Sequence, residues 1–147
     1  MKEPYMIKFS EDRISVAEYL SLREAVGWKP LTERQAELAM ENAIYRIFAY
    51  DGDKLVGMGR IVGDGAVVCY IQDLIVLPEY HHRGIGSMLI KLLTKYVKSL
   101  LADGEEMMFC LMCAKGREPF YIKHGFTPRP TDTLGPGMIR YMKRIES

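Results

Sequence analysis

The sequence predicts a single α/β (α+β) domain over residues 1–147, with a mixed sheet flanked by helices. A turn-like tetrapeptide joins two strand-like segments into an antiparallel hairpin. A long amphipathic helix lies between two apolar strand-like segments, and such a strand–helix–strand unit places its two strands parallel. The length of 147 residues fits one domain that buries its own core.

The first half of the chain predicts three strands and two helices. Two capping boxes, Ser15–Glu18 and Thr32–Gln35, mark where the helices begin. Asp51-Gly52-Asp53-Lys54 is a hairpin signal. The expected elements are a strand at 5–9, helices at 15–25 and 32–42, and strands at 44–50 and 55–62.

The second half contains the clearest helix pattern. From Gly84 onward, apolar residues recur at i, i+3, i+4 and i+7, while lysines fall outside that stripe. The long apolar strand before it is interrupted by the polar pair Gln72-Asp73, which suggests a β-bulge or a functional site. The expected elements are strands at 66–77, 107–113 and 138–145 and helices at 84–101 and 119–125.

Composition and charge argue against several classes of function. Lys and Arg number 20 against 19 Asp and Glu, a net charge of +1, so we expect no nucleic-acid partner attracted by bulk charge. No run reaches the roughly 18 apolar residues of a membrane helix, and the first residues lack the apolar centre of a signal peptide. We therefore expect a cytoplasmic protein with no membrane partner and with reduced cysteines.

The sequence predicts no metal site. Cys110 and Cys113 form a Cys-x-x-Cys pattern, but both fall in the expected strand at 107–113, where residues three apart point to opposite faces. His81 and His82 are adjacent and lack a third ligand at the spacing that zinc sites use.

A phosphate-binding site is expected where the strand at 66–77 leads into the long helix. Arg83, Gly84 and Gly86 open that helix, and the free N–H groups of a helix N-terminus attract anions. The Gly-x-x-x-x-Gly-Lys-Ser/Thr loop of nucleotide triphosphatases is absent, and Leu89 stands where a dinucleotide motif has its third glycine. On these features alone, a loop that only turns a strand into a helix remains an alternative.

Two motifs suggest a family. His81-His82-Arg83-Gly84-Ile85-Gly86, which follows Pro78-Glu79-Tyr80, resembles motif A of the GNAT acyltransferase superfamily. That motif reads Gln/Arg-x-x-Gly-x-Gly/Ala at a helix start, so the histidine at its first position is a departure. The segment 120–126 is similar to the family's second signature, Phe-Tyr-x-x-x-Gly-Phe. A second departure is Ala114, where many relatives carry Asn.

The resemblance covers nearly the whole chain and implies the GNAT fold. That fold is a mixed, mostly antiparallel sheet of about six or seven strands with a central parallel pair, flanked by about four helices. Around Gly27-Trp28 and Gly57-Met58-Gly59-Arg60, the chain further resembles the branch of plant chloroplast-type amine acetyltransferases and their bacterial relatives. The family often forms homodimers, and the terminal strand expected at 138–145 could serve that purpose.

The resemblance also implies an N-acetyltransferase with acetyl-CoA as cosubstrate and no metal. Backbone N–H groups of residues 82–87 would cradle the pyrophosphate, the strand end 74–76 would pair with the pantetheine arm, and an N–H near Leu74 would stabilise the oxyanion. The acceptor amine would attack the acetyl carbonyl directly. The implied cofactor-binding residues are Leu74, Ile75, Val76, His81, His82, Arg83, Gly84, Ile85, Gly86 and Ser87.

Two residues are candidates for proton transfer. Tyr121 matches the tyrosine that protonates the departing thiolate in many family members, and its alternative is a packed aromatic residue. Asp73 is the candidate general base, and its alternative is a structural ion pair with Arg60 or another cation. The candidates for lining the acceptor pocket are Trp28, Arg60 and Tyr70, each with packing or surface ion pairing as the alternative.

The expected acceptor is the primary amine of a small molecule. A protein or peptide acceptor and a non-enzymatic acyl-CoA sensor are the alternatives. The near-neutral net charge of +1 argues against a strongly basic peptide, because the chain offers no complementary field.

Overall fold

The computed structural model describes residues 6–144. The contacts between its residues divide the chain into two compact units, and the boundary in the sequence falls between residues 112 and 113. The first unit holds all the strands and the first three α-helices, and the second holds α4. None of the helices in the described range is long and apolar enough to cross a membrane.

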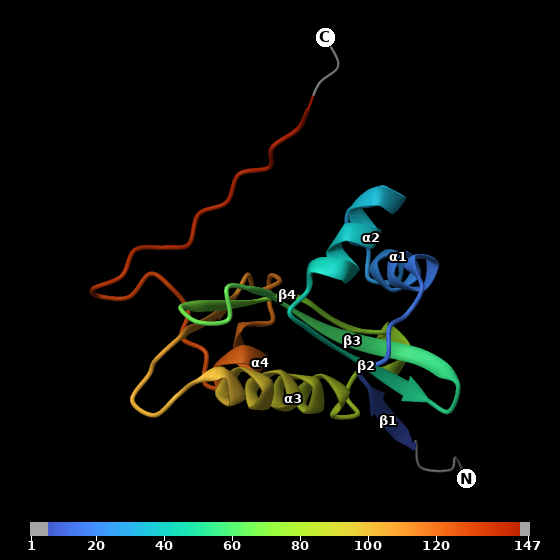
Figure 1. Ribbon diagram of the computed structural model, residues 1–147, viewed down its shortest axis with the longest axis horizontal. Helices are drawn as coiled ribbons and strands as arrows, with labels where there is room; N and C mark the ends of the chain where they lie inside the picture. Colours follow the sequence, from blue (N-terminus) through green and yellow to red (C-terminus); the bar gives the residue numbers. More distant parts are fainter. Residues whose placement is uncertain (1–5, 145–147) are drawn as a thin grey trace. The chain divides into compact units, whose positions relative to one another are not determined.

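A five-stranded sheet forms the frame of the first unit (Figure 1). Its strands, in spatial order, are β1 (Ile7–Ser10), β2 (Tyr45–Asp51), β3 (Lys54–Gly63), β4 (Val68–Val76) and β5 (Met108–Leu111). Neighbours from β1 to β4 are antiparallel, whereas β4 and β5 are parallel. The predicted hairpin and the predicted strand–helix–strand unit are therefore both confirmed.

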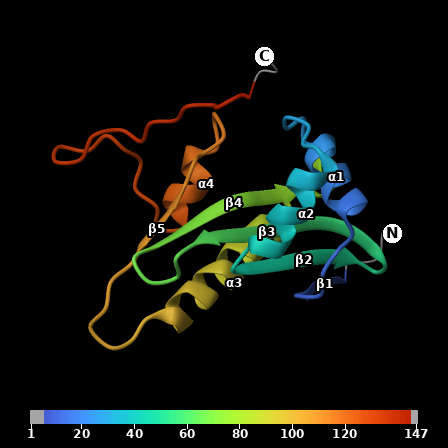
Figure 2. The same cartoon turned by 45° about the horizontal axis from the view of Figure 1, so that its top comes forward.

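Helices cover both faces of this sheet (Figure 2). α1 (Val16–Ala25) and α2 (Glu33–Asn42) lie on one face, and α3 (Ile85–Leu100) lies on the other. Both predicted capping boxes are present: the hydroxyl groups of Ser15 and Thr32 each accept a hydrogen bond from the backbone N–H three residues later. These caps satisfy donors that a helix N-terminus otherwise leaves unpaired.

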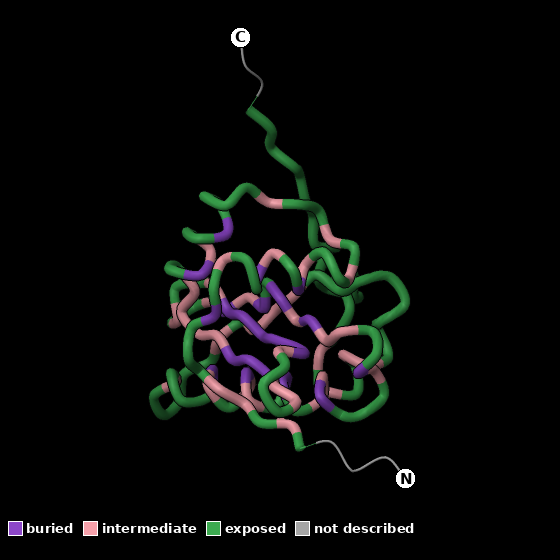
Figure 3. Tube along the Cα trace, turned by 90° about the vertical axis from the view of Figure 1, so that its right-hand side faces the viewer, coloured by how far each residue is buried: buried purple, intermediate pink, exposed green. Residues whose placement is uncertain are grey.

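The core of the first unit has two layers, one on each face of the sheet. On the α1/α2 face, Tyr19 and Leu22 pack with Phe48 and Met58, all of them buried. Figure 3 shows the buried segments gathered in the interior of the molecule. On the α3 face, Gly59 of β3 leaves the space that Leu93 fills, because a Cβ at this glycine would lie 2.9 Å from a Leu93 methyl group. Glycine thus lets α3 approach the sheet closely.

The structure has fewer strands than predicted. Five strands are observed in place of about six or seven, and no strand forms between Met112 and residue 144. The expected strand at 138–145 is absent over its described residues, and Ile145 lies outside them. Because β5 is the last strand in the order, the parallel pair lies at the edge of the sheet and not at its centre. A strand exists only through pairing with a neighbour, so an apolar pattern alone does not make one.

The second unit contains the helix α4 (Glu118–Lys123). Pro119 occupies its first turn, as predicted, where the missing N–H costs nothing. Gly125 follows the helix with φ +93°, a left-handed conformation that suits glycine. The predicted helix at 119–125 is therefore confirmed, apart from its last two residues.

Replacing Gly57 by Ala tests how closely β3 and β4 pack. The added Cβ would lie 2.7 Å from the carbonyl oxygen of Ile75, a backbone atom held in the neighbouring strand. We expect the free energy of unfolding, measured by urea denaturation, to fall by about 1–3 kcal/mol. Gly135→Ala is the control, because nothing lies within 4 Å of its Cβ, and equal effects of the two variants would contradict this prediction.

Candidate active site

A β-bulge interrupts β4 at the predicted polar pair. Arg60 of β3 pairs with Asp73, but the next residue of β3, Ile61, pairs with Ile71. Gln72 is therefore the extra residue, and the predicted bulge is confirmed. Gln72 is exposed, whereas Asp73 is fully buried.

The bulge marks the point where β4 and β5 separate. Their parallel pairing covers Val68 to Ile71 on β4 and stops there. Farther along, the N–H of Leu77 donates to Val56 of β3 at 2.9 Å, so the backbone groups of Val76 point the other way. The same alternation turns the N–H and C=O of Leu74 away from β3. This stretch of β4 thus has an open edge, with which no strand in the described part of the chain pairs.

The segment between β4 and α3 forms a tight, twisted loop. It contains a 3₁₀ turn at Pro78–Tyr80, and two residues, His82 and Gly84, adopt left-handed conformations with φ 64° and 80°. α3 then begins at Ile85 without a side-chain cap. The first N–H groups of a helix have no partner within the helix, so this terminus favours an anion.

A cluster of charged residues is buried on the α1/α2 face beside the bulge. The carboxylate of Asp73 accepts hydrogen bonds from the Tyr19 hydroxyl (2.6 Å), Arg60 Nε (2.6 Å) and Arg23 Nη1 (3.4 Å). Burial, followed by the charge of Asp73, raises the pKa of Tyr19 to about 12. Tyr19 therefore stays a hydrogen-bond donor at neutral pH, and both carboxylate oxygens are occupied.

These contacts favour the interpretation of Asp73 as one partner of a structural ion pair, and not as the general base. A general base must reach the proton that it removes, whereas Asp73 is 0% exposed and bonded on both oxygens. Arg60 is also buried, at 5% exposed, and its guanidinium additionally donates to the carbonyl of Ala39. The contacts therefore weigh against Arg60 as a residue that touches the acceptor.

The other acceptor candidates are Trp28 and Tyr70. The Trp28 ring, in the α1–α2 connection, lies 5.3 Å from the guanidinium carbon of Arg23. Tyr70 is half-buried on β4, opposite Cys110 in the strand register. Gln72 was missed as an acceptor candidate, although its polar side chain is exposed where β4 and β5 separate. The break in the apolar strand was the signal that could have identified it.

Tyr121 lies on α4 in the second unit. Its ring makes edge contacts with Phe120 (centroids 5.1 Å apart) and Phe126 (6.0 Å apart). Burial, and then the neighbouring Cys113, raises the pKa of Tyr121 to about 12, against a smaller opposing effect of Arg117. The phenol is therefore protonated at neutral pH, which is the state that a proton donor needs.

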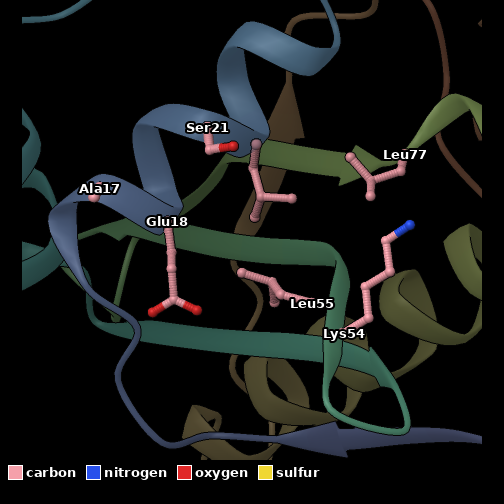
Figure 4. Close-up of a pocket in the computed structure, with 7 residues that line it drawn as sticks. Ala17, Glu18, Ser21, Lys54, Leu55 and Leu77 are labelled. Carbon is pink, nitrogen blue, oxygen red and sulfur yellow. The ribbon is translucent and has the colours of Figure 1, made fainter.

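A cavity of about 390 Å³ opens on the α1 face (Figure 4). It lies between α1, the start of β3 and the residue that follows β4. Its lining residues are Ala17, Glu18, Ser21, Leu22, Lys54, Leu55 and Leu77. None of the three predicted acceptor residues lines it. Within residues 6–144, no group of three or more His, Cys, Asp or Glu is placed to hold a metal ion.

The open strand edge and the uncapped helix N-terminus belong to an acyltransferase fold. The chain matches the family model for the acetyltransferase (GNAT) domain over residues 43–128. It is also 34% identical over 126 residues to YjcF of Bacillus subtilis, described as an uncharacterized N-acetyltransferase, covering 82% of this chain and 83% of that protein. The chain belongs to the GNAT family of N-acetyltransferases, whose members use acetyl-CoA.

Two further comparisons agree with this assignment. A Staphylococcus aureus crystal structure, described as a probable acetyltransferase, shares 33% identity and a TM-score of 0.81, covering 95% of this chain and all of that chain. The chloroplastic GCN5-related N-acetyltransferase 3 of Arabidopsis thaliana is 30% identical over 94 residues, covering 64% of this chain and 37% of that protein. The fold and the acyltransferase class are thus confirmed.

Substituting Asp73 tests the buried cluster. Asp73→Asn removes the negative charge between the buried guanidinium group of Arg60 and the partly buried one of Arg23. Breaking a buried pair in this way costs about 3–5 kcal/mol of folding free energy. We expect a loss in this range by chemical denaturation. The control is Asp53→Asn in the exposed β2–β3 turn, where the change should stay within about 0.5 kcal/mol. A stable Asp73→Asn protein that has lost only activity would instead favour the general-base role.

Proposed function

We propose that this N-acetyltransferase transfers the acetyl group of acetyl-CoA to the primary amine of a small molecule. The observation that carries the proposal is the open edge of β4, which one loop, residues 77–84, connects to the N-terminus of α3 that no side chain caps. A strand edge suits a ligand with amide groups, and a helix N-terminus suits a phosphate. Coenzyme A combines both chemistries in one molecule.

The cosubstrate would bind chiefly through backbone groups. In this proposal, N–H groups of residues 82–87 hold the pyrophosphate, and the Arg83 guanidinium adds charge-assisted hydrogen bonds. The amides of the pantetheine arm pair with Leu74 and Val76, whose backbone groups face the open edge. The twisted loop supports this role, because its left-handed residues fix where the N–H groups point.

The chemical step would be a direct displacement. The amine nitrogen forms a bond to the acetyl carbon, and the carbon–sulfur bond breaks. The N–H of Leu74, beside the bulge, stabilises the oxyanion, and Tyr121 gives its proton to the departing thiolate. We assign Asp73 to holding the bulge through Arg60, so the proton of the amine leaves through water.

The near-neutral net charge of the chain supports a small-molecule acceptor. The net charge of +1 offers no strong attraction for a basic peptide. Tyr70 and Gln72, near the point where β4 and β5 separate, supply aromatic and amide contacts of the kind that orient a small amine.

Incubation with acetyl-CoA and either an amine panel or a peptide library separates the two acceptor classes. Thiol release with aryl amines, polyamines or amino sugars supports the proposal, and activity on peptides alone contradicts it.

Tyr121→Phe tests the proton donor and distinguishes an enzyme from a sensor. We expect turnover to fall about 100-fold or more, because the phenylalanine ring has no proton to give. The affinity for CoA, measured by calorimetry, should stay within about twofold, since Tyr121 is not among the proposed CoA-binding groups. The control is Tyr141→Phe, on a side chain that is 75% exposed. CoA binding without turnover in both the wild type and Tyr121→Phe would favour the sensor.

A further inference from the structure

We infer that His81 is a positioning residue that fastens the phosphate-binding loop to the end of the pantetheine-binding strand. Its ring atom Nε2 lies 2.9 Å from the carbonyl oxygen of Val76, the last residue of β4. The inference rests on the proposed function and gives the His81 side chain a role separate from that of the backbone N–H groups of the loop. It also concerns the position at which this chain departs from the family motif.

The direction of the Val76 carbonyl shows that the hydrogen bond from His81 lies at the open edge of β4. Because the N–H of Leu77 donates to Val56 on β3, the carbonyl of Val76 points to the opposite side, toward the open edge. A carbonyl oxygen can only accept, so Nε2 of His81 carries the hydrogen. His81 therefore takes one of the two lone pairs of the Val76 carbonyl, while the N–H of Val76 still faces the open edge that the pantetheine arm would use.

The loop is held at other points as well. The hydroxyl of Tyr80 donates to Asp51 at 2.6 Å, which ties the loop to the end of β2. The backbone N–H of His81 donates to Pro78 at 3.2 Å, which closes the 3₁₀ turn. Tyr80 thus connects the loop to the β2–β3 hairpin, whereas the His81 ring connects it to β4 itself.

The position of His81 separates two binding regions. Val76 belongs to the strand edge, and the residues after His81 lead to the N-terminus of α3, which has no side-chain cap. A hydrogen bond across this short connection fixes the distance and angle between the two regions before the ligand arrives. Binding then requires less ordering of the loop, which strengthens affinity without any new contact to the ligand.

Two matched variants separate the hydrogen bond from the shape of the ring. His81→Phe keeps a flat ring but has no N–H, whereas His81→Gln keeps a donor on a side chain of different shape. We expect His81→Phe to weaken CoA binding, and to raise KM for acetyl-CoA, by about five- to tenfold, with kcat within about twofold. His81→Gln should restore both values to within about twofold of the wild type. Wild-type affinity in His81→Phe, or equal losses in both variants, would overturn the inference.

The ring of the wild-type protein provides a test that does not depend on catalysis. The ¹⁵N NMR shifts of the His81 ring should report the Nε2–H tautomer without ligand, and CoA should leave that tautomer unchanged. The Nδ1–H tautomer in the ligand-free protein would overturn the inference, whatever the chain acetylates. A change of tautomer on CoA addition would also overturn it, because the ring would then be contacting the ligand. Failure of the wild type to bind CoA, with the Nε2–H tautomer present, would instead contradict the proposed function.

Discussion

The active-site architecture depends on one buried carboxylate. Asp73 is removed from water completely, and an unpaired charge in that position would be costly. Arg60 pairs with it across the β3–β4 ladder, while Tyr19 and Arg23 reach it from α1. The same carboxylate therefore joins two strands and a helix at the residue where β4 changes register. Its hydrogen bonds are what make the bulge a fixed feature of the sheet.

The bulge in turn lies where the outer edge of β4 becomes open, which is the edge proposed to pair with the cosubstrate. On one side of Gln72, β4 is fully paired with β5, and on the other side its outer edge is open. An open edge is normally a hazard, because it invites pairing with another chain. Here the open stretch is short, and the His81 side chain already bonds the Val76 carbonyl at its end. Such an arrangement limits pairing to a short, strand-like ligand.

Local signals in the sequence predicted much of this fold. The capping boxes, the hairpin turn, the stripe of α3 and the break at Gln72-Asp73 each involve residues close in the chain. Arg60 was named as a possible partner of Asp73, but Arg23 and Tyr19 could not be predicted in the same way, since they lie 50 and 54 positions away. The general-base interpretation of Asp73 came from a correct observation, an acid within an apolar strand. The tertiary contacts decide between that interpretation and the ion pair with Arg60, and they add Arg23 and the Tyr19 hydroxyl.

The predicted strand at the end of the chain failed for a related reason. An apolar pattern shows that a segment can become a strand, but the pairing partner decides whether it does. The proposed binding of a ligand with several phosphates is compatible with a net charge of only +1. Backbone N–H groups at a helix N-terminus and along a strand edge carry no net charge, so they do not appear in the composition. Their value as a binding site depends on being held in place, and His81, Tyr80 and the Asp73 cluster are the side chains that hold them.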